Sequence, residues 1–355
     1  MSKYSVGVDI SKKDFHVCLS VIDSFQQVKV LRSGTFANSK SGFAALVTWL
    51  KASRKDKSFG MAITMEATGV YFENCALFLY SKGYAVSVVL PNKAKKYIGS
   101  LGIRTKNDKS DAKALSRMGA EQVLDKWAPH GPFFYELRAL TRHSQSLKEM
   151  RTSATNQLEA IELGMYPSKS VIRSQKKMIA IVDEQIVSNT KAISAHIASN
   201  EEVSRKILDI TAIKGVAELT AATVLAETNG FELFNSIGQL VSYAGYDVVE
   251  NQSGTHNGKT KISKQGNSRI RRALHMSSLC VVTHEVDIFK DLFERTYEKH
   301  KIKMKSYVAI QKKLLGIMYT LWKKNEKFDP KYGIKDTAKD EEVVHSSRGC
   351  LEEAV

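Results

Sequence analysis

The sequence predicts an N-terminal α/β domain followed by a mainly helical remainder. Short apolar runs with strand periodicity alternate with helical segments through the first third of the chain. Strand signals then disappear and long helical periodicity takes over. With 355 residues, 43% of them hydrophobic, the chain is long enough for more than one packed core.

The predicted strands and helices of the N-terminal domain come in a recognisable order. Strands are expected at 6–10, 15–22 and 27–36, and short polar turns should make them neighbours. A helix over 41–52, a buried strand over 61–66, a helix over 71–83 that ends at Gly83, and a strand over 84–90 follow. Three adjacent strands and then helix, strand, helix and strand is the order of the ribonuclease-H-like fold.

We expect four regions along the chain: residues 1–130, the α/β domain; 131–208, a helical coiled-coil region; 209–328, a second and mostly helical domain; and 329–355, a polar tail. One set of residues in the second region is spaced by threes and fours, which is typical of a coiled-coil seam. These residues are Ile179, Val182, Ile186, Asn189 and Ile193. Two long helices packed within one subunit and a coiled coil between subunits both fit this spacing.

The net charge indicates a polyanionic partner. A formal charge of +16 favours either nucleic acid or an anionic membrane surface. No segment approaches the roughly 18 apolar residues of a membrane-spanning helix, and the first residues lack a secretion signal, so we expect a cytoplasmic protein. The four cysteines are far apart and show no zinc-ligand spacing. Nucleic acid is therefore the expected partner, without a membrane.

Four carboxylates lie where they could meet. Asp9 and Glu66 each end an apolar strand, and Asp108 and Asp111 stand three apart at the start of a helical run, on one helix face. Crowded carboxylates repel each other, and oxygen ligands suit Mg²⁺ or Mn²⁺, which can clamp a phosphodiester. Each acid taken singly also fits a turn or a helix cap. The four together predict a metal site for hydrolysis or strand transfer.

The segments around these acids resemble a known family. GVDISK, MEATG and RTKNDKSDA are similar, in order and spacing, to signature blocks of the DEDD transposases of bacterial insertion sequences. That family includes the Piv-type DNA invertases and the bridge-RNA-guided recombinases. The likeness continues in SVVLPNKAKKYIGSLGIRTKND, TAIKGVAELTAATVLAE, YAGYDVVENQSGTHNGKTKISKQGN and RIRRALHMSS. It implies a RuvC-like catalytic domain that holds Mg²⁺ or Mn²⁺ on Asp9, Glu66, Asp108 and Asp111, and a C-terminal transposase domain.

The resemblance also implies a nucleophile and partners. The family's nucleophilic serine matches Ser253 in NQSGTHNG, which would attack a DNA phosphate to give a phosphoserine link. A Ser-Gly pair in a polar loop is by itself typical of a turn, and Ser263 is a second candidate. The implied activity is transposition or site-specific recombination of double-stranded DNA. A noncoding bridge RNA would guide it, and the subunits would form a dimer or tetramer.

Two basic segments are candidate nucleic-acid contacts. TAIKGVAELTAATVLAE looks like a helix-hairpin-helix in which Gly215 allows a tight turn, but the family's Pro-Gly-Ile-Gly is replaced by a turn that starts at Lys214. Phosphate binding and a purely structural hairpin both remain open there. The second segment, between Asn251 and His275, contains no acid, which favours binding to a phosphate backbone. Its basic residues are Lys259, Lys261, Lys264, Arg269, Arg271 and Arg272.

Three other functions fit parts of the sequence. A junction-resolving endonuclease of the same fold would need the acids but no serine. GVDISK also resembles the first phosphate loop of actin-like and sugar-kinase ATPases, yet the sequence shows neither their second phosphate loop nor an adenosine site. A non-catalytic nucleic-acid-binding module would keep its activity without Glu66.

Overall fold

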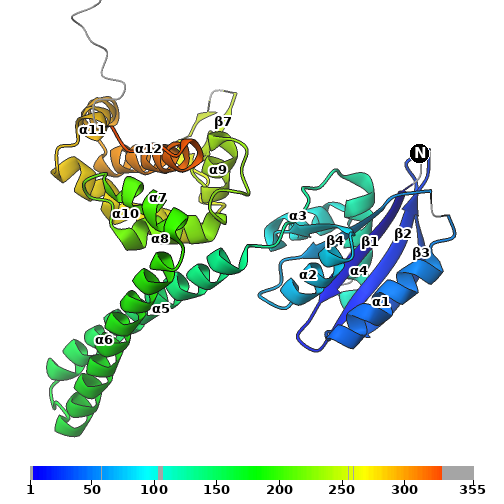
Figure 1. Ribbon diagram of the computed structural model, residues 1–355, viewed down its shortest axis with the longest axis horizontal. Coiled ribbons are helices and arrows are strands. Elements are labelled where there is room, and N and C mark those ends of the chain that lie inside the picture. Colours follow the sequence, from blue (N-terminus) through cyan, green and yellow to red (C-terminus); the bar gives the residue numbers. More distant parts are fainter. Residues whose placement is uncertain (1–2, 57, 103–106, 255, 259, 330–355) are drawn as a thin grey trace, which may run out of the picture. The chain divides into compact units, whose positions relative to one another are not determined.

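A five-stranded mixed sheet forms the centre of the N-terminal unit, Met1–Pro129. Its strands are β1 (Lys3–Ile10), β2 (Asp14–Ile22), β3 (Val28–Ala37), β4 (Met61–Glu66) and β5 (Ala85–Val89). They are ordered β3-β2-β1-β4-β5, and β1 pairs antiparallel with β2 but parallel with β4 (Figure 1). Strands β2 and β3 are antiparallel and β4 and β5 parallel. This arrangement confirms the predicted ribonuclease-H-like α/β fold.

The computed structural model describes residues 3–56, 58–102, 107–254, 256–258 and 260–329. The chain divides into the N-terminal unit and a C-terminal unit, His130–Val355. Among the helices of these described residues, none is both long and apolar enough to cross a lipid bilayer.

Helices cover both faces of the sheet. These are α1 (Lys40–Ser53), α2 (Glu73–Ser81), α3 (Pro91–Ser100) and α4 (Asp108–Glu121). Because side chains alternate along a strand, Val6 and Val8 of β1 point into the core formed with Leu46 and Leu50 of α1. The opposite face of β1 carries Ser5, Gly7 and Asp9 and receives α4, so the site residues lie on the α4 side.

Helix α4 approaches β1 so closely that only glycine fits beneath it. A Cβ at Gly7 would lie 2.0 Å from the carbonyl oxygen of Ala112. One turn further along, Ser5 Oγ donates to the carbonyl oxygen of Ser116 at 2.6 Å, and Ser116 Oγ donates to that of Ser5 at 2.9 Å. Since α4 passes over Ser5 and then Gly7 towards its own N-terminus, its first turn reaches the end of β1 at Asp9.

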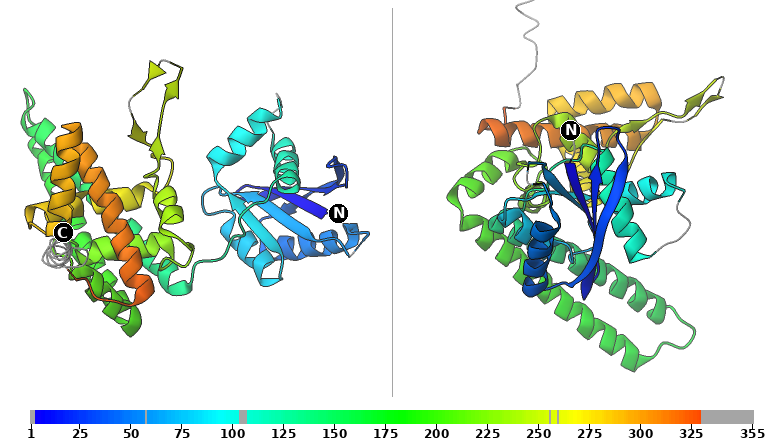
Figure 2. Two further views of the ribbon diagram at one scale, coloured as in Figure 1. Left: turned by 90° about the horizontal axis from the view of Figure 1, so that it is seen from above. Right: turned by 90° about the vertical axis from the view of Figure 1, so that its right-hand side faces the viewer.

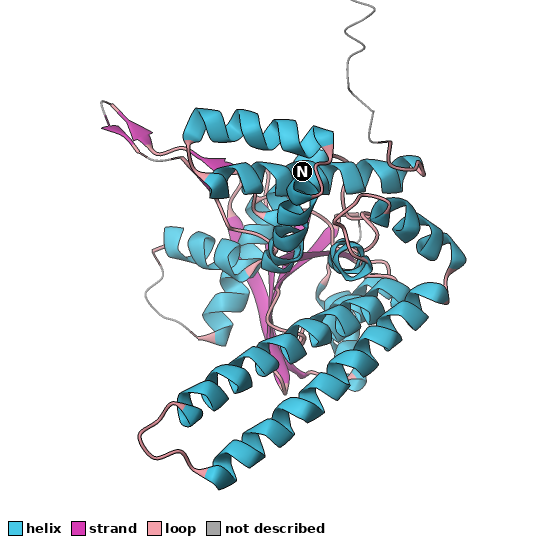
Figure 3. Ribbon diagram, turned by 90° about the vertical axis from the view of Figure 1, so that its left-hand side faces the viewer, coloured by secondary structure: helices cyan, strands magenta, loops and turns pink. Residues whose placement is uncertain are grey.

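In the C-terminal unit two long helices, α5 (Pro132–Glu162) and α6 (Lys169–Ala198), pack side by side as a hairpin (Figure 3). The seam predicted from the sequence faces α5. Asn189 and Ile193 are buried, and Asn189 Nδ2 donates to the carbonyl oxygen of Leu140 at 3.1 Å. Asn189 and Ile193 of this seam therefore pack within the subunit, as in the first of the two arrangements that the spacing allowed.

The rest of the C-terminal unit is helical around one large core. Its helices are α7 (Glu201–Thr211), α8 (Glu218–Thr228), α9 (Ile237–Ala244), α10 (Ser268–Thr283), α11 (Asp287–His300) and α12 (Lys303–Lys324). Buried side chains from these helices and from the segments between them, including Phe231, Leu274 and Leu314, belong to one cluster. The predicted helical character of this region is confirmed.

Between α9 and α10 a narrow ribbon projects from the helices (Figure 2, left). The sequence indicated a loop here, but the chain forms two short antiparallel ladders. Strand β6 (Val248–Val249) pairs with β9 (Lys261–Ile262), and β7 (Gln252–Ser253) pairs with β8 (His256–Asn257). Most of the described side chains of the ribbon are exposed, so it lacks the alternation of apolar and polar residues by which strands are recognised in a sequence.

Candidate active site and nucleic-acid interface

The first two predicted carboxylates lie side by side at the edge of the sheet. The parallel register of β1 and β4 pairs Val8 with Met65, so the next residues, Asp9 and Glu66, are neighbours on the α4 side. On the other flank of Asp9, the antiparallel register of β1 and β2 pairs it with His16. Three adjacent strands thus present one acid, a second acid and an imidazole in a row.

The other two carboxylates come from the first turn of α4. Asn107 is the N-cap of this helix: its side chain accepts from the Ser110 N–H at 2.8 Å, while Ser110 Oγ accepts from the Asn107 N–H at 3.0 Å. A cap role for Asp108 and Asp111 is thereby excluded, because Asn107 and Ser110 already perform it. Asp108 Oδ2 instead lies 3.6 Å from His16 Nδ1.

The structure brings the other three acids close enough to Asp9 to raise its pKa. Burial, followed by repulsion from Asp108, Asp111 and Glu66, raises the pKa of Asp9 from 3.8 to about 6, against an opposing influence of His16. Within the described part of the chain, no group of three or more His, Cys, Asp or Glu side chains is already arranged so that it could hold a metal ion. The donor set of carboxylate oxygens nevertheless fits a hard divalent cation, whose charge would relieve this repulsion.

His16 was missed in the sequence because a single histidine in an apolar strand carries no motif. The available signal was the short turn between the first two predicted strands. Pairing them as a tight hairpin places residue 16 opposite residue 9. The register of the hairpin therefore adds a fifth polar group to the acidic cluster.

Ser253, the predicted nucleophile, lies in β7 near the tip of the ribbon and is exposed. It precedes Gly254, whose φ of +55° is in the left-handed region that suits glycine at a turn. Ser263, the second candidate, is partly buried at the base of the ribbon, where its N–H donates to the carbonyl oxygen of Asp247 at 2.8 Å. Of the two hydroxyls, that of Ser253 is on the more accessible residue.

The predicted basic contacts have different surroundings. Lys259 lies outside the described residues, and Lys261 and Lys264 are exposed. Arg271 Nη1 donates to the carbonyl oxygen of Ala244 at 2.8 Å, and Arg272 forms an ion pair with Glu149. Arg271 thus holds the end of α9, whereas both lysines of the ribbon base face solvent.

Packing accounts for the glycine of the predicted helix-hairpin-helix. Gly215 has φ of +98°, and a Cβ there would lie 2.9 Å from the backbone N of Val281 in α10. Lys214 is exposed, but Glu218 occupies the first turn of the following helix and accepts from Ser194 Oγ at 2.7 Å. The structural hairpin explains Gly215 fully, and phosphate binding at this turn stays a prediction.

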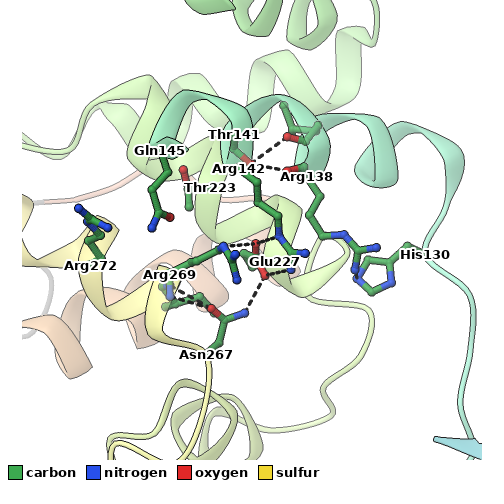
Figure 4. Close-up of polar contacts among 12 residues, drawn as sticks. His130, Arg138, Thr141, Arg142, Gln145, Thr223, Glu227, Asn267, Arg269 and Arg272 are labelled. Carbon is green, nitrogen blue, oxygen red and sulfur yellow. Dashed lines mark hydrogen bonds and ion pairs between the residues drawn. The ribbon is translucent and has the colours of Figure 1, made fainter. Parts of the chain in front are cut away.

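A buried ion cluster at the base of the ribbon had no counterpart in the sequence prediction (Figure 4). The side chain of Glu227, in α8, is 1% exposed and receives Arg142 Nε at 2.7 Å and Arg142 Nη2 at 2.9 Å. Asn267 Nδ2 donates at 2.8 Å to Oε2 of this carboxylate, the oxygen that also accepts from Arg142 Nη2. Since the three residues are 85 and 40 positions apart, no local pattern could connect them.

Comparisons with known proteins agree with these features. Residues 6–167 match a family profile described as transposase, that of the DEDD transposases of the IS110 type, and residues 209–294 match a profile described as the transposase IS116/IS110/IS902 family. The pilin gene-inverting protein of Moraxella bovis is 30% identical over 93% of this chain and 98% of its own length. The transposase for insertion sequence element IS1111A of Coxiella burnetii is 22% identical over 91% of this chain and 90% of its own.

Among solved structures, Thermus thermophilus RuvC in complex with a Holliday junction substrate matches 33% of this chain and 93% of its own, with 13% identity and a TM-score of 0.26. The two matched profiles and the identity to the Moraxella protein over nearly all of both chains lead to one conclusion. This protein belongs to the IS116/IS110/IS902 family of transposases, enzymes that break and rejoin DNA.

Proposed function

We propose that this transposase recombines double-stranded DNA through a phosphoserine link at Ser253, and that Asp9, Glu66, Asp108 and Asp111 hold the divalent cation which the reaction needs. The observation that carries the proposal is the gathering of three acids around Asp9, whose pKa is raised to about 6 by burial and then by repulsion from Asp108, Asp111 and Glu66. An acid whose pKa is raised by burial and by neighbouring acids is typical of a functional site. Mg²⁺ is the expected ion and Mn²⁺ its substitute.

The chemistry assigned to Ser253 is a phosphoryl exchange. Its Oγ attacks the phosphorus of a phosphodiester, the bond from phosphorus to one deoxyribose oxygen breaks, and that oxygen leaves as a hydroxyl carrying the serine proton. Attack by the hydroxyl of another strand reverses these bond changes and rejoins the DNA. A bound divalent cation supplies stabilisation of negative charge on the phosphate oxygens. The four acids hold the cation, and His16 orients Asp108.

The proposed partners follow from charge and family. A chain with a net charge of +16 is suited to polyanions, and the exposed Lys261 and Lys264 flank the base of the serine ribbon. We expect element and target DNA to bind there together with a noncoding bridge RNA that supplies sequence choice by base pairing. Lys214, Gly215, Lys259, Arg269, Arg271 and Arg272 remain further proposed contacts. A homo-oligomer, dimer or tetramer, acting in the cytoplasm would bring two DNA sites together.

The test is to capture the covalent link. Full-length protein is incubated with supercoiled DNA bearing the element junction, Mg²⁺ and RNA from cells that carry the element, and SDS-stable protein–DNA adducts are then measured. We expect an adduct that is lost in Ser253→Ala, retained in Ser263→Ala and reduced by about 100-fold or more in Asp9→Asn. An adduct formed equally by Ser253→Ala would overturn the assignment. Cleavage without any adduct would favour the junction-resolving endonuclease, and digestion of the RNA beforehand tests the guide.

A further inference from the structure

The buried carboxylate of Glu227 faces two guanidinium groups from different helices. Arg142 of α5 binds it through two nitrogens, and Arg269 Nε of α10 lies 4.0 Å from its Oε1 (Figure 4). Both arginine side chains remain about two-fifths exposed, with values of 40% and 42%. Each therefore has one part against the buried acid and another part at the surface.

Glu227 stays ionised in this position. Burial alone would raise the pKa of Glu227, but the hydrogen bonds and charge of Arg142, with the hydrogen bond from Asn267, lower it below its usual value. An ionised, hydrogen-bonded carboxylate restricts the guanidinium of Arg142 to one orientation, because bidentate pairing fixes the plane of the group. The orientation of this cation is thus set within the fold before any ligand arrives.

The same acid is joined to the start of α10. Asn267 is the N-cap of this helix: its Oδ1 accepts from the Arg269 N–H at 2.9 Å, while its Nδ2 donates to Glu227 Oε2 at 2.8 Å. The first turn of α10 contains no acid, and two of its residues, Arg269 and Arg271, are basic. Because the N-terminus of a helix is already positive, these arginines add charge where an anion is favoured and a cation is not.

Arg269 also carries an unsatisfied donor. Its Nε is buried and has no hydrogen-bond partner among the described residues, since 4.0 Å from Glu227 is beyond hydrogen-bonding distance. A buried donor without an acceptor costs about 1–3 kcal/mol. Because Arg269 Nε makes no hydrogen bond to Glu227 and the side chain is partly exposed, its guanidinium can donate to an anionic oxygen at the surface.

We propose that Arg142, oriented by the buried Glu227, and Arg269, attracted to the same carboxylate by its charge, form a phosphate clamp for a nucleic-acid backbone at the foot of the serine ribbon. The ligand is a phosphodiester, from DNA or from RNA. Glu227 is a positioning residue here, because it contacts the two arginines and not the phosphate. The inference rests on the proposed function only in taking nucleic acid as the ligand.

Charge alone and positioning predict opposite effects for one substitution. Glu227→Gln removes a negative charge from a basic surface, so electrostatic attraction alone would strengthen nucleic-acid binding. If the carboxylate instead orients the arginines, its loss weakens binding although the protein becomes more positive. The sign of the change in affinity therefore separates simple electrostatic attraction from positioning of the arginines.

The experiment measures affinity against salt concentration in Ser253→Ala protein with EDTA, so that no reaction can occur. The probes are a labelled duplex DNA and a labelled structured RNA. For duplex DNA we expect Arg269→Gln to weaken binding about tenfold and to lower the salt slope by about 0.9, the value for one phosphate contact. We expect Glu227→Gln to weaken binding about fivefold, with a melting temperature that still leaves the protein folded in the assay.

A matched pair of controls joins α5, the helix of Arg142, to α6. Arg151 Nε forms an exposed ion pair with Asp183 at 2.6 Å, so Arg151→Gln and Asp183→Asn repeat the charge changes away from Glu227. Unchanged salt slopes in these controls support the clamp. Equal losses in Arg151→Gln and Arg269→Gln, or tighter binding by Glu227→Gln, would overturn it.

The two probes identify the source of the phosphate. A larger loss with duplex DNA assigns the clamp to DNA, and a larger loss with RNA assigns it to the guide. No loss with either probe rejects the clamp. Because binding is measured without catalysis, failure of the serine chemistry leaves this result readable, and failure of the clamp leaves the adduct assay unaffected.

Discussion

Replacing Asp9 by asparagine should stabilise the cation-free protein near neutral pH while abolishing its activity. Asp9 has its pKa raised from 3.8 to about 6 by burial and by its three acidic neighbours. A rise of about two units corresponds to about 3 kcal/mol at about 1.4 kcal/mol per unit, and screening by solvent at this partly exposed group reduces the expected effect to about 1–2 kcal/mol. The folded state pays this cost only when Asp9 is ionised.

The pH dependence follows from the direction of the shift. Because the pKa of the folded state lies above that of the unfolded state, the stability linked to Asp9 is fully present below pH 3.8 and is lost as pH rises to about 6. The difference between Asp9→Asn and the unchanged protein should therefore be small near pH 4 and full above pH 6. Thermal unfolding in EDTA should show a gain of about 3–8 °C for the N-terminal unit at pH 7.5.

Two comparisons make this measurement decisive. Mg²⁺ should raise the melting temperature of the unchanged protein but have much less effect on Asp9→Asn, since one of the four proposed ligands has lost its charge. Asp56→Asn is the matched control, because hydrogen bonds from Ser58 lower the pKa of this exposed acid and its neutralisation should bring no gain. A melting temperature that falls in Asp9→Asn at pH 7.5, or a gain that is the same at pH 4, would refute the raised pKa of Asp9 in the folded protein.

Two further substitutions test the packing that positions the site. Gly7→Ala should displace α4, because the new Cβ would lie 2.0 Å from the backbone oxygen of Ala112. We expect the free energy of unfolding to fall by about 1–3 kcal/mol and the amount of adduct to fall about 100-fold. Gly60→Ala is the control and should behave as the unchanged protein, because a Cβ at Gly60 would have nothing within 4 Å. Asn189→Ala should cost about 1–2 kcal/mol in urea unfolding of the C-terminal unit, because the buried Asn189 side chain is removed and the part-buried carbonyl oxygen of Leu140 loses its side-chain donor. An unchanged midpoint would contradict this role.

Much of the N-terminal fold could be predicted because its signals are local. Strands β1, β2 and β4 alternate or are continuously apolar, and turn residues separate them, so their order was readable along the chain. Asp9 and Glu66 could be singled out because each stands at the polar end of such a strand. Asp108 and Asp111 were visible because three residues separate them at a helix start.

The ribbon could not be predicted in the same way. Its strands are two residues long and largely exposed, so neither face requires apolar side chains. The pairing depends on backbone hydrogen bonds between residues on opposite sides of a turn, such as Gly258 N–H to the carbonyl oxygen of Asn251 at 2.8 Å. Backbone groups are the same in every residue type, and they leave little trace in the sequence.

The sequence by itself was enough to predict the fold class of this protein, to give its basic charge and to single out the four acids as candidate ligands. Strand periodicity and the spacing of residues within one element are properties of neighbouring residues, and net charge is a property of composition. Only the tertiary structure decided that His16 flanks Asp9, that Gly7 must be glycine beneath α4, and that Glu227 holds Arg142 and Asn267. These contacts join residues brought together by strand register and helix packing. Such pairings depend on the free energy of the whole fold, which no local pattern records.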